Sequence, residues 1–269
     1  MIDRRQWRIA PHAVFLIALF FDVGCWPTPL DSNVLKVSCA ASLQQPITML
    51  AKRFEKLHSI RIQLQFGGTS MLINQAKLAN NADVLISADQ FSTDQLVLSK
   101  QVSEYVPLVI QTPVIVTTKS AAANIHGTAD LLRDDVKLGL GDLRATSIGK
   151  ATKSGLGSDA NTFFQHAVVT RTTVTALATD LKVGSLDAAI VWDSTALQFD
   201  LNTVQDEKLG RHSEASSACL MSTSIQRKIA KDFLRFVTRS QEAKRVFADL
   251  QFQVAPDSKQ PQQQELKPR

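Results

Sequence analysis

The chain has 269 residues, of which 44% are hydrophobic and 20% charged, a composition typical of a folded globular protein. Its formal net charge of +5 comes from 30 basic and 25 acidic side chains. The basic residues are scattered and are not interleaved with aromatic side chains, which argues against a nucleic-acid-binding protein. Three cysteines are too few for a disulfide framework, and no Cys and His spacing typical of a metal site occurs.

The first 24 residues have the organisation of a secretory signal peptide. Three arginines precede an apolar run over residues 13–21, which is too short to cross a bilayer as a lone helix. A buried N-terminal helix is the alternative interpretation. Cys25 follows Val-Gly as in a bacterial lipoprotein cleavage box, but Asp22 stands where that box has an aliphatic residue, so lipidation of Cys25 stays open. We expect an exported protein with a signal peptide over residues 1–24 and a linker over residues 25–33.

From residue 34 onward, strand patterns and helix patterns alternate. The apolar run 34–40 predicts a strand, and the helical spacing that follows it makes Ser42 the expected N-cap of a helix. Residues 60–66 alternate between apolar and polar types, which predicts a half-buried strand, and "GGTS" (67–70) interrupts it before another helical pattern. The run 82–89 adds a further strand. This order is typical of an α/β domain with a mostly parallel sheet and helices packed on its faces.

A second strand–helix set follows a long β-rich run over residues 107–119. That run is long enough to cross between two lobes. Residues 147–169 are expected to be mostly helical, and the apolar stripe that begins at Val174 predicts a helix that ends at Gly184. We predict two lobes with these boundaries: lobe 1 over residues 34–110 and 220–255, lobe 2 over residues 111–219, and a disordered tail over residues 256–269.

Catalytic motifs do not occur in the chain. It has neither the G-x-S-x-G turn of a serine hydrolase nor a phosphate-binding G-x-x-x-x-G-K-[ST] loop. Asp83 and Asp89 are candidates for acid–base work, but their flanking residues fit a strand end and a helix cap better. We therefore do not expect an enzyme; an exported hydrolase that uses Asp83 or Asp89 is the alternative.

Two loops, "AASL" and "GGTSM", lead from predicted strands directly into helices. Helix N-termini carry free N–H groups and a partial positive charge, so they bind anions. Gly67 and Gly68 allow a close approach of the backbone, and the hydroxyls of Ser42 and Thr69 are additional donors. Ordinary helix capping is the alternative for each loop alone. Together, the two loops predict an anion site at the carboxyl ends of neighbouring strands.

The stretches "CAASL", "FGGTSML", "NADVLISADQ" and "AIVWDSTA" occur in this order, and with them the chain resembles the periplasmic molybdate-binding proteins of ABC importers over residues 34–254. The resemblance implies a two-lobed periplasmic-binding-protein fold of type II, with crossing hinge strands and an oxyanion held between the lobes without a bound cation. It implies a monomer in the periplasm or on the outer face of the cytoplasmic membrane, without a cofactor. Its expected partners are an ABC permease and the ATPase of that permease.

The resemblance also implies five contacts to the ligand. Two are the hydroxyls of Ser42 and Thr69, where Thr69 replaces a serine of the family. Two are backbone amides at Ile148 and Val174, although the chain reads Ser-Ile-Gly around Ile148 where the family has Pro-Ala-Gly. The fifth contact falls on Trp192, where the family commonly has a tyrosine. An indole N–H can only donate, which suits a fully deprotonated oxyanion; a buried core tryptophan is the alternative.

A set of donors without an acceptor favours molybdate or tungstate over phosphate. Phosphate keeps a proton near neutral pH, and that proton needs an acceptor. Asp193 would repel a dianion, so we expect it to turn away and cap the following helix. The sequence does not distinguish between molybdate, tungstate and sulfate as the ligand. It also leaves open whether Cys39 and Cys219 form a disulfide. A receptor for another anion or small solute on the same fold is the alternative; a ferric receptor would need paired tyrosines, and Tyr105 is the single one. A regulatory effector-binding domain conflicts with the export signal.

Overall fold

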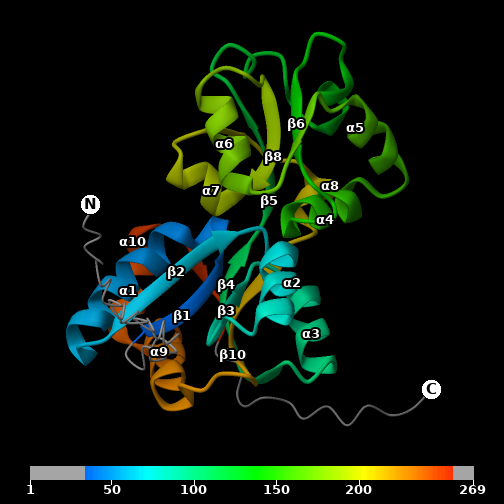
Figure 1. Cartoon of the computed structure of the whole chain (residues 1–269). Helices are drawn as coiled ribbons and strands as arrows, with labels where there is room; N and C mark the ends of the chain where they lie inside the picture. Colours follow the sequence, from blue (N-terminus) through cyan, green and yellow to red (C-terminus); the bar gives the residue numbers. More distant parts are fainter. Residues whose placement is uncertain (1–33, 257–269) are drawn as a thin grey trace, which may run out of the picture. The chain divides into compact units, whose positions relative to one another are not determined.

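The computed structural model describes residues 34–256, which belong to a single compact unit (Figure 1). The predicted signal peptide, the linker with Cys25, and the tail beyond residue 256 lie outside the described residues. None of the described helices combines the length and the apolar character that are needed to span a bilayer.

A six-stranded sheet forms the first lobe. Its elements are β1 (Val34–Ala40), α1 (Gln44–His58), β2 (Arg61–Gly67), α2 (Thr69–Ala79), β3 (Val84–Ser87), α3 (Gln90–Leu98), β4 (Val102–Gln111), β10 (Glu214–Met221), α9 (Arg227–Arg239), α10 (Gln241–Asp249) and β11 (Gln253–Val254). The strand order is β11-β4-β10-β3-β1-β2. Alternate residues of a strand face opposite sides of a sheet. Ala218 and Leu220 of β10 therefore pack under α1, α9 and α10, whereas Cys219 and Met221 pack under α2 and α3.

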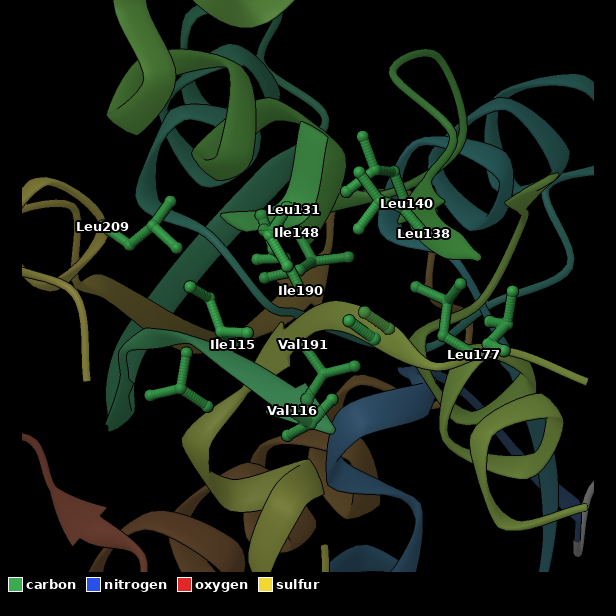
Figure 2. Close-up of a cluster of buried hydrophobic side chains, with 14 of the residues drawn as sticks. Ile115, Val116, Leu131, Leu138, Leu140, Ile148, Leu177, Ile190, Val191 and Leu209 are labelled. Atoms are coloured by element: carbon green, nitrogen blue, oxygen red, sulfur yellow. The ribbon is translucent and has the colours of Figure 1, made fainter. Parts of the chain in front are cut away.

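A five-stranded sheet in the order β7-β6-β8-β5-β9 forms the second lobe. Its elements are β5 (Pro113–Thr117), β6 (Leu138–Gly141), α4 (Ser147–Leu156), α5 (Ala160–His166), β7 (Val169–Arg171), α6 (Val174–Lys182), β8 (Ala188–Trp192), α7 (Asp193–Gln198), β9 (Asn202–Val204) and α8 (Glu207–Gly210). Figure 2 shows its core, in which strand residues such as Ile115 and Ile190 meet side chains of the surrounding helices. Val174, Leu177, Ala178 and Leu181 are buried on α6, as the helical stripe predicts.

The prediction of two α/β lobes joined by crossing strands is confirmed, but both sheets are mixed rather than mostly parallel. β1 runs parallel to β2 and β3, and β6 runs parallel to β7 and β8, whereas β4, β5 and β10 form antiparallel pairs. The chain leaves the first sheet at Thr112, between β4 and β5. It returns before Glu214, because β10 pairs with β4 from Glu214 to Met221. The return is thus earlier than the expected boundary at residue 220.

One local prediction needs correction. Ser42 is not the N-cap of α1: it lies inside a 3₁₀ turn, Ala41–Leu43, and α1 begins at Gln44. Pro46 falls in the first turn of α1, where its missing N–H has no cost. The stretch 147–169 is mostly helical, as predicted, and Gly157, with a positive φ of 58°, separates α4 from α5.

Candidate functional site

A small cavity lies between the two lobes, at the loops that follow the carboxyl ends of the strands. All five residues that were predicted to contact a ligand line it, within this set: Ala40, Ala41, Ser42, Gly67, Gly68, Thr69 and Ala88 from the first lobe, and Thr146, Ser147, Ile148, Val174 and Trp192 from the second. The cavity volume is about 20 Å³. A single water needs about 10–15 Å³ on the same measure, so the cavity suits a solute of a few heavy atoms rather than a sugar or a peptide.

The first lobe contributes two buried hydroxyls. Ser42 is 2% exposed, and its Oγ has no hydrogen-bond partner among the described residues. Because Ser42 also lines the cavity, this hydroxyl is free to bond with a group from outside the chain. Thr69 is the first residue of α2, and its Oγ1 accepts the N–H of Ala88 at 3.2 Å. Thr69 thereby has a fixed orientation at the cavity, and its one proton can go either to a ligand or to the Oγ of Ser147, 2.9 Å away.

The second lobe contributes backbone N–H groups from two helix N-termini. The side chain of Thr146 caps α4 by accepting the N–H of Gly149 at 3.0 Å, and the side chain of Thr173 caps α6 in the same way. Ile148 is the second residue of α4, and Val174 is the first residue of α6. The N–H groups of a first helical turn have no acceptor inside the helix, and the caps leave these two free. The side chains of Ile148 and Val174 belong to the lobe core (Figure 2 labels Ile148), so the backbone is what these residues can offer a ligand.

Trp192 is the last residue of β8. It lines the cavity and also packs in the core of the second lobe. Its neighbour Asp193 does not line the cavity. The Asp193 carboxylate accepts the N–H groups of Ser194 at 2.7 Å and of Thr112 at 3.1 Å, and burial raises its pKa. Asp193 therefore faces the hinge at Thr112. It is the first residue of α7 rather than its cap, a position that Trp192 occupies.

The cavity is electropositive without a cation in its lining. No Lys, Arg, Asp or Glu lines it among the residues that the structure describes. Three helices of at least nine residues, α2, α4 and α6, begin at the cavity. Each helix N-terminus carries about half a positive charge. Within residues 34–256, no group of three or more His, Cys, Asp or Glu is placed to hold a metal ion.

A contact across the lobes that sequence reasoning missed lies directly behind the cavity. The hydroxyl of Ser147 donates to the carboxylate of Asp89 and also lies 2.9 Å from the Oγ1 of Thr69. Asp89 caps α3 by accepting the N–H of Ser92 at 2.7 Å, which agrees with its interpretation as a helix cap. The helix-start pattern around Thr146 was a detectable signal for the α4 terminus. The partner of Asp89 was not, because it depends on how the lobes meet.

Asp83, the other carboxylate considered for acid–base work, is a structural group. It is buried, and it accepts the N–H of Lys36 at 2.9 Å and the O–H of Ser224 at 2.7 Å. It does not line the cavity. Cys39 and Cys219 are both free and buried. Burial raises the pKa of Cys39 well above its usual range and that of Cys219 to about 12, so both thiols stay protonated.

The chain belongs to the family of bacterial extracellular solute-binding proteins, whose family model matches residues 35–252. Three solved structures share its fold. A periplasmic molybdate-binding protein of Azotobacter vinelandii is 15% identical, with 83% of this chain and 100% of that chain covered and a TM-score of 0.67. A sulfate-binding protein of Mycobacterium tuberculosis is 13% identical (82% and 86% covered, TM-score 0.66). Iron-bound HitA of Pseudomonas aeruginosa is 15% identical (87% and 90% covered, TM-score 0.64). At these identities the likeness is one of fold.

Proposed function

We propose that this protein captures molybdate or tungstate in the cavity between its lobes and delivers it to an ABC importer. The observation that carries the proposal is a lining that offers hydrogen-bond donors and no ionised acceptor. The Ser42 hydroxyl has no partner among the described residues, the first turns of α4 and α6 with their free amides line the same space, and no carboxylate of the described chain lines it.

Such a site holds a dianion without a neighbouring lysine or arginine. A hydrogen bond to a charged partner contributes about 1.5–3 kcal/mol. The five proposed donors are the hydroxyls of Ser42 and Thr69, the amides of Ile148 and Val174, and the indole of Trp192. Less the cost of association, they give an affinity in the micromolar range or tighter. The proton of hydrogen phosphate needs an acceptor, and of these five groups only the neutral hydroxyls of Ser42 and Thr69 can accept, so hydrogen phosphate is disfavoured.

Sulfate is the second candidate, because it is also a fully deprotonated tetrahedral dianion and a sulfate-binding protein shares this fold. The size of the closed cavity decides between these anions. Iron has less support: Tyr105, the single tyrosine of the chain, lies on β4 and does not line the cavity.

A thermal-shift panel tests the proposal. A ligand that binds the folded protein alone raises the unfolding free energy by RT ln(1 + [L]/Kd), which is about 2.7 kcal/mol at a concentration of 100 Kd. Molybdate and tungstate are expected to raise the melting temperature, with phosphate and ferric citrate without effect at equal concentration. A shift with ferric citrate alone contradicts an oxyanion site. Elemental analysis after desalting is expected to give one molybdenum or tungsten per chain.

A further inference from the structure

The first turn of α4 reaches across the cavity to the first lobe at two points. Ser147 contacts Asp89 and Thr69, and Lys150 contacts Ser70 and Phe91. These contacts join the N-terminal turn of α4 to the starts of α2 and α3, beside the proposed ligand. Lys150 and Asp89 do not themselves line the cavity.

The Ser147 contact is a charge-assisted hydrogen bond between the lobes. Serine has one proton, and an ionised carboxylate can only accept, so the Ser147 proton goes to Asp89. Both residues are buried, at 3% exposure each. Hydrogen bonds to a charged group are about twice as strong as neutral ones, so this bond favours the arrangement in which the lobes meet.

The Lys150 contact places a cation where two helix N-termini already carry partial positive charge. Its Nζ donates to the Oγ of Ser70 at 2.8 Å and lies 5.5 Å from the ring centroid of Phe91. Ser70 is in the first turn of α2, and Lys150 is in the first turn of α4. A cation is unfavourable at these positions, and an anion in the cavity offsets that repulsion. The Lys150 charge also acts on Glu214. Burial raises the pKa of Glu214, the N–H of Gln90 lowers it, the charges of Asp89 and Asp94 raise it, and the charge of Lys150 lowers it.

The lobes meet tightly at Gly68. A Cβ at this position would lie 2.6 Å from the carbonyl oxygen of Thr172 in the second lobe and would also overlap the carbonyl oxygen of Ala145. A side chain at residue 68 would fit only if the two lobes moved apart. The contacts of Ser147 and Lys150 are therefore made at close range.

We propose that Ser147 and Lys150 form a clasp between the lobes that sets the rate at which the ligand leaves. The proposal rests on the proposed function, since it concerns release from the same cavity. The clasp forms whenever the lobes meet, with or without a ligand, and the ligand enters while the lobes are apart. Its loss therefore raises the dissociation rate and leaves the association rate nearly unchanged.

Stopped-flow tryptophan fluorescence with molybdate as the probe tests the clasp in the wild type and in the variants Ser147→Ala and Lys150→Met. We expect dissociation to be about tenfold faster for Ser147→Ala, because a charge-assisted bond is lost, and at least threefold faster for Lys150→Met. Association rates are expected to stay within twofold. Lys153→Met is the matched control, because Lys153 is an exposed lysine on the same helix. Wild-type dissociation rates in both clasp variants overturn the proposal, as does a loss of affinity that lies in association alone.

Small-angle X-ray scattering of the anion-free protein separates the clasp from the proposed function. The double variant Ser147→Ala, Lys150→Met is expected to have a larger radius of gyration than the wild type, with an unchanged far-ultraviolet circular dichroism spectrum. If the wild type binds no oxyanion, the proposed function fails and the scattering result alone decides on the clasp. An unchanged radius of gyration then overturns it.

Discussion

Replacing Ser42 by alanine is expected to separate ligand binding from folding. The Ser42 side chain is buried, at 2% exposure, and its hydroxyl has no partner within residues 34–256. In the folded protein without an anion, the hydroxyl is therefore a cost and not a source of stability. In the complex, we expect it to donate to a charged oxygen.

The substitution is expected to weaken ligand binding and to leave the folded protein equally stable or more stable. Loss of a hydrogen bond to a charged partner removes about 1.5–3 kcal/mol of binding free energy, which raises Kd roughly 10- to 100-fold. The unfolding free energy without anion is expected to be unchanged or to rise by up to about 1 kcal/mol, because an unsatisfied buried group disappears. Isothermal titration with molybdate gives the first quantity, and urea denaturation gives the second.

Ser217→Ala is the matched control for this experiment. The Ser217 hydroxyl is also buried without a partner, but it lies on β10 and does not line the cavity. It is expected to reproduce the stability change with an unaltered Kd. A wild-type Kd in Ser42→Ala refutes the reasoning, and so does a variant that binds weakly only because it is partly unfolded.

Three further outcomes are expected. Trp192→Phe removes the indole N–H and is expected to raise the Kd for molybdate about tenfold. In the wild type, molybdate is expected to change the fluorescence of Trp192. An unaltered Kd in the variant would mean that Trp192 is a core residue only. Gly68→Ala is expected to abolish binding, because the added methyl group collides with carbonyls of the other lobe. Gly210→Ala is its control: no atom lies within 4 Å of the added Cβ, and this variant is expected to bind normally in the same titration. Burial raises the pKa of Glu214, so the stability linked to its neutral form is present at low pH and lost as pH rises. The melting-temperature gain of Glu214→Gln over the wild type is thus expected to be larger at pH 7.5 than at pH 4, and an equal gain at both contradicts the buried charge.

The sequence predicted the parts of the site that depend on local signals. Small residues and hydroxyls between a strand and a helix identified the loops of Ser42 and Thr69, because each loop is encoded in a few adjacent residues. The amides at Ile148 and Val174 and the position of Trp192 came from the resemblance to a family. The structure brings all five residues to one cavity.

The parts that the sequence could not predict depend on long-range geometry. Ser42 looked like a helix cap, because a 3₁₀ turn before a helix gives the same pattern as a helix start. The return to the first lobe was placed too late, because the apolar residues of β10 fit either sheet. The bond from Ser147 to Asp89 joins residues 58 positions apart in different lobes, which no periodicity encodes.

Isothermal titration of the protein with molybdate, tungstate, sulfate and phosphate, side by side, tests the proposed oxyanion site most directly. We predict one site per chain, micromolar or tighter binding of molybdate and tungstate, and phosphate binding at least about 100-fold weaker. Preferred binding of sulfate would retain the site and change the solute. Phosphate bound as tightly as molybdate, or no heat of binding with any of the four anions, would contradict the account.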